Sequence, residues 1–271
     1  MTTLTAPNAS TQAALPIRLP TAARRALTPL LVIALWQLAS SLGWIEERLI
    51  PSPLHIVQTF ARLTLSGELP WHLLVSLSRA GTGLAIGLAA GTLLALIAGL
   101  SHRGEDAVDP MLQMLRTLPH LALVPLFILW FGIGNTPKIA LVALGSAFPI
   151  YINLFAGIRG VDAKVVEAMT TLGLTRSEMI RHIILPGALP SALVGLRYAI
   201  GVAWLSLVVG EQINASSGVG YLIMNAREFV QTDVIFVGLI VYAALGLGAD
   251  MLVRWLERRA LVWRPRYVKA S

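Results

Sequence analysis

Long apolar runs, separated by short charged segments, recur throughout this 271-residue chain. Hydrophobic residues make up 56% of it and charged residues only 13%, whereas a soluble domain carries about 25% charged residues. A bilayer is crossed by about 20 apolar residues in a helix, and backbone polar groups find no partner in lipid unless the helix itself supplies it. The sequence therefore predicts an all-α polytopic membrane protein.

The apolar runs predict six transmembrane helices. The first run begins too late and is too long for a signal peptide and has no small-residue cleavage site after it, so we interpret it as an uncleaved span. The Thr-, Ala- and Pro-rich residues 1–26 before it predict a disordered cytoplasmic tail. Residues 27–70 comprise the first span and a periplasmic loop with one short helix. The predicted spans are 27–44, 71–100, 109–132, 138–157, 191–209 and 233–253, and Pro119 and Pro125 are expected to interrupt the third.

The positions of arginine and lysine predict the orientation. Cytoplasmic segments of membrane proteins are enriched in these residues. With both termini inside, most of them fall on the cytoplasmic side, Arg116 and the basic tail 258–271 included. Those expected outside are Arg48, Arg62, Lys138 and Arg227. This asymmetry accounts for the net charge of +7 without a nucleic acid partner.

Motifs for catalysis or cofactor binding are absent from the sequence. The chain contains no cysteine, and hence no disulfide framework or thiolate metal site. It also lacks the glycine-rich phosphate loop G-x-x-x-x-G-K-[ST], and its five histidines are scattered. An intramembrane enzyme would need converging polar groups, which the sequence does not indicate. A structural or signalling membrane scaffold, which needs no transport path, stays open as an alternative to a transporter, and co-purification with an ATPase would discriminate these two.

Residues 161–190 form a polar segment between two apolar runs, and their pattern predicts a helical hairpin. Val161–Leu172 is expected to be helical, and Gly173 to end that helix in a left-handed conformation. Thr175 and Glu178 match a capping box at the start of a second helix. This helix is expected to run to about Ile184, where Pro186 and Pro190 stop it.

The spacing of this hairpin resembles the EAA loop of ABC importer permeases. The matching positions are Glu167, Ala168, Gly173, Ile183, Leu185 and Pro186, while Met169 departs from the alanine of the family pattern. Residues 71–257 as a whole look like the transmembrane domain of type I ABC importers. The stretches 118–134, 148–153, 185–211 and 217–234 resemble the nitrate, sulfonate and taurine permease group, and within it most nearly the aliphatic sulfonate permeases.

The resemblance implies a function and a set of partners. This chain would be the non-enzymatic permease subunit, a homodimer in the bacterial inner membrane. Its EAA loops would dock two ATPase subunits that bind the ATP, with no cofactor on this chain itself. A periplasmic binding protein would deliver the substrate. Aliphatic sulfonates are the expected substrates, with taurine or nitrate as the alternatives.

Several residues are candidates for the translocation path or its gate. Prolines within spans free backbone carbonyls, which must then face protein or water, and broken helices often line transport paths. Charged residues inside a span are usually functional or paired. The candidates are Arg79, Pro125, Pro149, Tyr151, Asn153, Glu211, Gly218 and Gly220.

The segment from Glu211 to Thr232 is expected in the periplasm, between the last two spans. Its Ser216, Ser217, Gly218 and Gly220 predict a flexible loop that forms an outer gate and part of the docking surface for the binding protein. In the second span, Gly83, Gly87 and Gly91 recur every four residues and predict a helix-packing seam.

Overall fold

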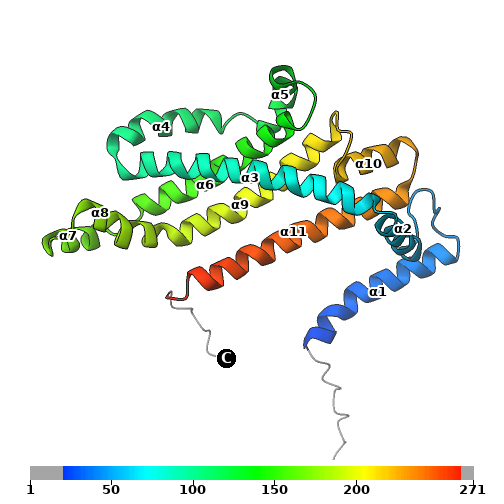
Figure 1. Cartoon of the computed structure of the whole chain (residues 1–271). Coiled ribbons are helices and arrows are strands. Elements are labelled where there is room, and N and C mark those ends of the chain that lie inside the picture. Colours follow the sequence, from blue (N-terminus) through cyan, green and yellow to red (C-terminus); the bar gives the residue numbers. More distant parts are fainter. Residues whose placement is uncertain (1–20, 264–271) are drawn as a thin grey trace, which may run out of the picture. The chain divides into compact units, whose positions relative to one another are not determined.

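The structure, a computed structural model, describes residues 21–263 and contains helices and turns in that range, with no strand (Figure 1). The chain divides into two compact units, residues 1–54 and 55–271. The helices are α1 Thr21–Ser41, α2 Pro53–Leu65, α3 Glu68–Leu100, α4 His102–Leu115, α5 Val124–Phe131, α6 Thr136–Arg159, α7 Ala163–Thr171, α8 Arg176–Met179, α9 Leu185–Gln212, α10 Val219–Glu228 and α11 Thr232–Ala260.

The first unit consists of α1 and the loop after it. The helix begins at Thr21, inside the predicted tail 1–26, of which residues 1–20 lie outside the described range. Its apolar part, Leu27–Ser41, is shorter than the other spans, so a membrane crossing here stays a prediction. The loop folds back on the helix, since the Leu54 backbone N–H donates to Gln37 Oε1 at 3.0 Å.

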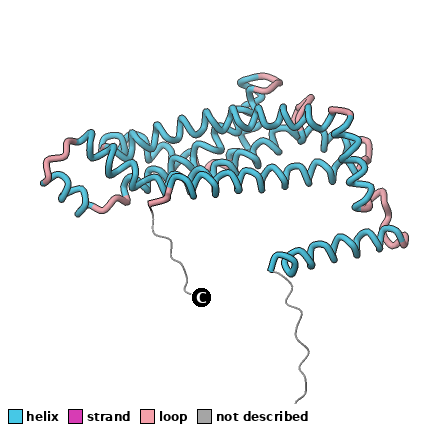
Figure 2. The backbone as a smooth tube through the Cα atoms, turned by 60° about the horizontal axis from the view of Figure 1, so that its bottom comes forward, coloured by secondary structure: helices cyan, strands magenta, loops and turns pink. Residues whose placement is uncertain are grey.

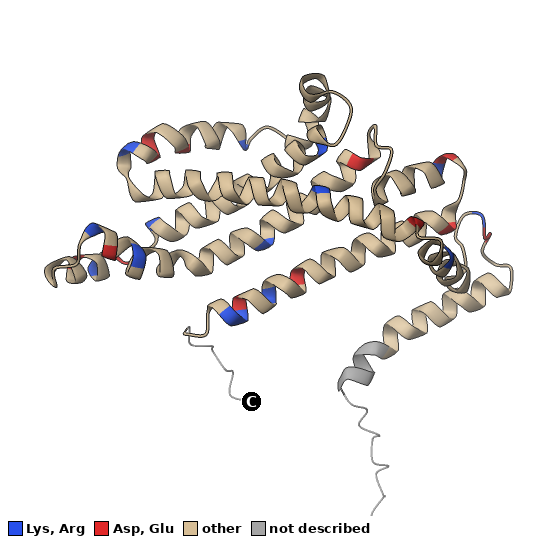
Figure 3. Ribbon diagram, viewed as in Figure 1, with Lys and Arg blue, Asp and Glu red and all other residues tan. Residues whose placement is uncertain are grey.

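Four helices of the second unit are long and apolar enough to cross a membrane. They are α3, α6, the continuous helix from Arg176 to Gln212, and α11. A bent pair, α4 with α5, supplies a fifth span if it is counted as one. Lys, Arg, Asp and Glu gather toward helix ends and the α7–α8 segment, leaving long uncharged stretches between them (Figure 3). The predicted short helix in the loop between the first two spans is α2.

The predicted interruption of the span 109–132 is confirmed at Pro119 and wrong at Pro125, and the first helix of this span begins earlier, at His102. The structure has α4, a break at residues 116–119, a 3₁₀ turn over His120–Leu123, and α5, with a bend of 81° between the two halves. Pro119 explains the break, because proline has no N–H and disfavours helical backbone at the residue before it. Pro125 lies in the first turn of α5, where no helical hydrogen bond is lost. It therefore starts a helix instead of kinking one.

The predicted glycine seam packs α3 against α6. A Cβ atom added at Gly83, Gly87 or Gly91 would overlap atoms of α6, among them the Ser146 hydroxyl and the Ala143 and Ala147 carbonyl oxygens. In lipid no hydrophobic drive brings helices together, so close backbone approach is needed for their association. α6 also packs closely on α9, where a Cβ at Gly195 would approach Asn153 and the Pro149 carbonyl. These helices run side by side in the second unit (Figure 2).

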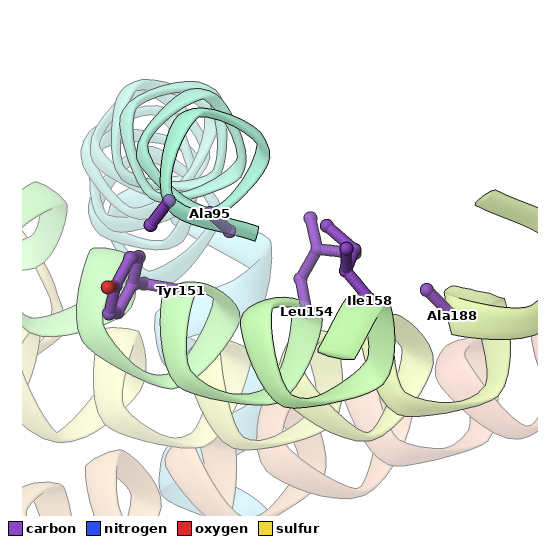
Figure 4. Packing of buried hydrophobic residues seen from close by; sticks show 6 residues of the cluster. Ala95, Tyr151, Leu154, Ile158 and Ala188 are labelled. Carbon is purple, nitrogen blue, oxygen red and sulfur yellow. The ribbon is translucent and has the colours of Figure 1, made fainter. Parts of the chain in front are cut away.

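Toward the C-terminal ends of α3 and α6, small and large side chains pack together in one buried cluster (Figure 4). Ala95 lies against the stacked rings of Tyr151 and Phe155, whose centroids are 5.7 Å apart. Leu154 and Ile158 continue the cluster along α6 to Ala188 of α9. The small residues on α3 and α9 leave the space that the larger side chains of α6 fill.

The predicted end of the second loop helix near Ile184 is also wrong. After α8 the chain makes a π-helical turn, Ile180–Ile184, and continues directly into α9. The Leu185 N–H donates to Ile180 O, five residues back. Pro186 cannot donate to His182 O and would clash with it in a regular helix, and the wider π turn accommodates this. The prolines therefore shape one continuous helix, about 55 Å long at 1.5 Å per residue.

The glycine seam gives a test of the fold. Replacing Gly87 with alanine should destabilise the protein by about 1–3 kcal/mol, because the new methyl group meets backbone atoms of α6 that cannot move aside. Gly81 lies on the same helix with open space around it. Gly81→Ala should therefore leave stability unchanged or raise it by about 0.5–1 kcal/mol. Thermal unfolding of the purified protein in detergent measures both, and equal behaviour would rule out the seam.

Candidate functional site

The segment from Asp162 to Ile184 folds as the predicted helical hairpin. The Asp162 side chain caps α7 by accepting from Lys164 N at 2.9 Å. Gly173 ends this helix with a φ of 87°, a conformation that favours glycine. The Thr175 N–H donates to Glu178 Oε2 at 2.8 Å and the Glu178 N–H to Thr175 Oγ1 at 3.4 Å. The predicted capping box is therefore confirmed, and both turns of the hairpin are rigidly defined.

The hairpin presents an exposed surface that is partly apolar. Glu167, Ala168 and Gly173 are exposed, Leu185 is exposed at the start of α9, and Ile183 and Pro186 are half-buried. Val165 and Leu172 add exposed apolar side chains, the latter 73% exposed. Sequence reasoning missed these two residues, although their spacing from Ala168 along one helical face could have indicated them.

A cavity of about 690 Å³ lies between the hairpin and the adjoining ends of α3 and α6. Gly99 and Ile158 form its wall on the long helices, and Glu167 and Met179 on the hairpin. Arg176 bridges its edge, since its Nη2 donates to Leu100 O at 3.1 Å. The hairpin is therefore attached to the membrane helices through α9 and this bridge, and not packed flat against them.

At the other end of the long helices, a buried ion pair joins α3 to α9. Arg79 Nη1 lies 2.8 Å from Glu211 Oε1, and the two side chains are 5% and 0% exposed. Arg79 also donates to Asn135 Oδ1, at 2.9 Å, and to both the backbone and side-chain oxygens of Ser217. Its charge is compensated within the protein, which favours a structural link over a role in compensating a passing anion.

The Glu211 carboxylate accepts further hydrogen bonds from α3, α10 and α11. Ser76 Oγ lies 2.8 Å from Oε2, the Gly220 N–H lies 3.0 Å from it, and Tyr242 Oη lies 3.4 Å from it. Ser76 Oγ in turn accepts from Val219 N at 2.9 Å. A buried carboxylate is stable only when paired and hydrogen-bonded in this way. We call Arg79, Glu211, Ser76, Ser217 and Tyr242 the outer polar cluster.

The outer segment from Glu211 to Thr232 is ordered, so the prediction of a flexible loop is wrong. It contains helix α10, whose Val219 and Leu222 are buried. Gly218 has a φ of 113°, and a Cβ there would overlap the Glu211 carboxylate. A Cβ at Gly220 would lie 2.6 Å from Glu211 Cβ. These glycines therefore allow close packing around Glu211, and α10 packs on α11, α9 and α3.

The remaining sequence candidates lie apart from this cluster, on α6 and α5. Tyr151 donates to Asp109 Oδ1 at 2.8 Å, which ties α6 to α4. Asn153 donates to Pro149 O, one turn back in the same helix, at 2.8 Å. The structure thus brings Arg79, Glu211, Gly218 and Gly220 together, but not Pro125, Pro149, Tyr151 or Asn153. Sequence reasoning missed Ser76, Asn135 and Tyr242, which are common polar residues with no distinguishing pattern.

The fold is a bundle of long apolar helices from which a polar helical hairpin protrudes. Residues 87–262 match the family of binding-protein-dependent transport system inner membrane components. The chain therefore belongs to this family, whose members are ABC permease subunits of multi-pass membrane complexes.

Within this family, the chain is similar to permeases named for particular substrates. The chain is 50% identical over 241 residues to the aliphatic sulfonates transport permease protein SsuC of Bacillus subtilis, covering 89% of this chain and 87% of the relative. It is 54% identical over 239 residues to SsuC of Escherichia coli, covering 88% and 91%. The taurine transport system permease protein TauC of Escherichia coli is 34% identical over 239 residues, covering 86% of each.

Solved structures support the same fold. A chain of an amino acid ABC transporter crystallised with histidines superimposes with a TM-score of 0.58, covering 75% of this chain and 96% of that one. A chain of the MetNI methionine transporter, in an inward-facing form, gives 0.53 and covers 66% and 91%. At 20% and 18% identity these matches show the fold alone, which is the predicted type I importer fold.

The buried ion pair gives a stability test. Glu211→Gln or Arg79→Gln should each cost about 3–5 kcal/mol, because each leaves an uncompensated buried charge. The double variant Arg79→Met, Glu211→Leu should recover part of that loss. Asp250→Asn, which weakens the partly exposed pairs with Arg254 and Arg197, should cost no more than about 1 kcal/mol. Thermal unfolding in detergent compares the four, and additive losses in the double variant would contradict a coupled pair.

Proposed function

We propose that this chain is the permease subunit of an ATP-driven importer that carries aliphatic sulfonates from periplasm to cytoplasm. The observation that carries the substrate assignment is the identity of 50% and 54% to two sulfonate permeases over nearly their whole length. The taurine permease, at 34%, is clearly more distant. A sulfonate is charged at any physiological pH, so it cannot cross the lipid without a protein path.

The exposed hairpin is the proposed docking site for the ATPase subunits, which bind and hydrolyse the ATP. The candidate coupling residues are Glu167, Ala168, Gly173, Ile183, Leu185 and Pro186. Apolar side chains exposed on a polar helix, such as Val165 and Leu172, suit a protein partner. With the hairpin in the cytoplasm, α10 and α2 lie on the periplasmic side, where a binding protein would deliver the substrate. Two copies of this chain would enclose the path between them, with both termini cytoplasmic.

The continuous helix from Arg176 to Gln212 supports a mechanism for coupling. The capping box lies at its hairpin end, and Glu211 lies at its outer end within the polar cluster. A helix of this length transmits a displacement along its axis because its backbone hydrogen bonds resist stretching. Closure of the ATPase dimer would move the hairpin, and α9 would carry that movement to the outer polar cluster. Arg79, Glu211, Gly218 and Gly220 would then act at the outer gate.

Growth on defined sulfur sources tests the substrate. A strain without its own sulfonate and taurine permeases, given this chain with its ATPase and binding protein, should grow on an alkanesulfonate as sole sulfur source. Growth on taurine but not on the alkanesulfonate would show that the chain is a taurine permease instead. Growth on sulfate is the control for viability, and a Walker-motif variant of the ATPase is the control for ATP dependence.

A change in the hairpin tests the coupling role. Gly173→Pro should abolish uptake, because proline cannot adopt the φ of 87° found there. Glu167→Lys should strongly reduce uptake by reversing the charge of an exposed hairpin residue. Arg181→Gln, also exposed in this segment, is the matched control and should keep most of the uptake. All three should reach the membrane in wild-type amount, and normal uptake in Gly173→Pro would exclude this coupling role.

A further inference from the structure

The break between α4 and α5 carries an arginine at membrane depth. α4 starts beside the hairpin end of α3 and runs antiparallel to it, pairing Glu105 with Arg159. Tyr151, which binds Asp109, lies eight residues before Arg159, or about 12 Å along α6. Arg116 directly follows α4, seven residues after Asp109 and farther still from the hairpin end. This position differs from its predicted place in the cytoplasm.

A second contact fixes the depth of the break from the other side. His120 Nε2 lies 3.1 Å from Ser206 Oγ of α9, and its ring also lies beside Gly145 of α6. Gly145 is about 14 Å from the outer end of α6 and about 21 Å from its hairpin end. Ser206 donates its own proton to Val202 O at 2.8 Å, so His120 must donate to Ser206. The hydrogen bond to α9 and the contact with α6 place the break well inside the apolar length of the bundle.

Arg116 differs from the other basic side chains along the spans. Arg79 is paired with Glu211. Lys138 is 5% exposed and donates to two backbone carbonyls. Arg197 is paired with Asp250 and Glu257, at 3.6 and 2.8 Å. Arg116 is exposed, and within residues 21–263 its guanidinium has no ion pair or hydrogen bond. An arginine at this depth cannot face lipid without a large cost, so it faces water or protein.

The surroundings of Arg116 suit an anion with a short apolar chain. Met114, Leu115 and Leu118 are 71%, 37% and 49% exposed beside it. The break leaves backbone carbonyls that also require water or protein around them. A guanidinium with five free donors binds a sulfonate head group through charge-assisted hydrogen bonds, and the apolar side chains can contact an alkyl tail.

We infer that Arg116, at the break between α4 and α5, binds the anionic head group of the substrate in a water-accessible path near the middle of the membrane. The inference rests on the proposed function for the identity of the anion, an aliphatic sulfonate. It assigns the charge compensation of a crossing anion to Arg116, and not to Arg79, which is paired with Glu211. The site lies on a discontinuous span, where bending between α4 and α5 can change its access.

Thiol labelling tests the site without reference to the natural substrate. Thr117→Cys introduces one cysteine into a chain that has none. The complete complex, with ATPase and binding protein in nanodiscs, is treated with methanethiosulfonate ethylsulfonate, an anion, or with the ethyltrimethylammonium analogue, a cation. Mass spectrometry of this chain follows each reaction. Both reagents should react, and adding Arg116→Gln should lower the anion-to-cation rate ratio at least about threefold.

The matched control is Arg103→Gln, which removes an exposed arginine from the other end of α4. It should leave the rate ratio unchanged. Absence of reaction with either reagent would show that lipid or a second copy covers the break, and would overturn the inference. An unchanged ratio after Arg116→Gln would overturn it as well.

Measurements of uptake distinguish a role of Arg116 in binding the substrate from a role in maintaining the structure. In proteoliposomes, Arg116→Gln should lower butanesulfonate uptake about tenfold or more, while ATP hydrolysis stimulated by the loaded binding protein persists. Arg116→Lys should retain part of the uptake. A proportional loss of uptake and stimulated hydrolysis would make Arg116 structural. Should the wild-type complex carry no alkanesulfonate, the proposed function fails, and the labelling ratio still decides whether Arg116 forms an anion site.

Discussion

Close backbone contact between α3, α6 and α9 is the constraint on which the rest of the structure depends. Glycines on α3 and α9 allow α6 to approach so closely that a single added methyl group would overlap its backbone. In lipid, this packing replaces the hydrophobic effect that assembles soluble bundles. It also brings Arg79 and Glu211 within 2.8 Å, so the outer polar cluster depends on the same approach.

The second unit is rigid along α9 and interrupted along α4 and α5. Pro186 and Pro190 leave α9 continuous: a π turn directly precedes Pro186, and Pro190 lies within the helix itself. Pro119 instead breaks the other span, with an 81° bend. The difference is physically reasonable for a transporter: a helix that transmits movement must be stiff, whereas a helix that exposes a site must offer unpaired polar groups and room to bend.

Charge is distributed along the bundle in a way that fits these roles. The outer end holds a compensated, buried pair that fastens three elements and the α10 segment. Near the middle of α9, Arg197 joins this helix to α11 through two carboxylates. Within residues 21–263, the guanidinium of Arg116 at the α4–α5 break has no such partner. In an apolar medium such a group needs a partner, and a transported anion would supply it.

The sequence by itself determined the class of fold, the capped hairpin and the glycine seam, because each depends on local chemistry: apolar length, Thr175 with Glu178, and small residues four apart. It misjudged Pro186 and Pro190 as helix stops, since the packed chain forms a π turn before Pro186 and keeps Pro190 inside α9. It could not pair Arg79 with Glu211, 132 positions apart, or find Arg116 at the break. Those arrangements depend on which helices lie side by side, which only the tertiary structure decides.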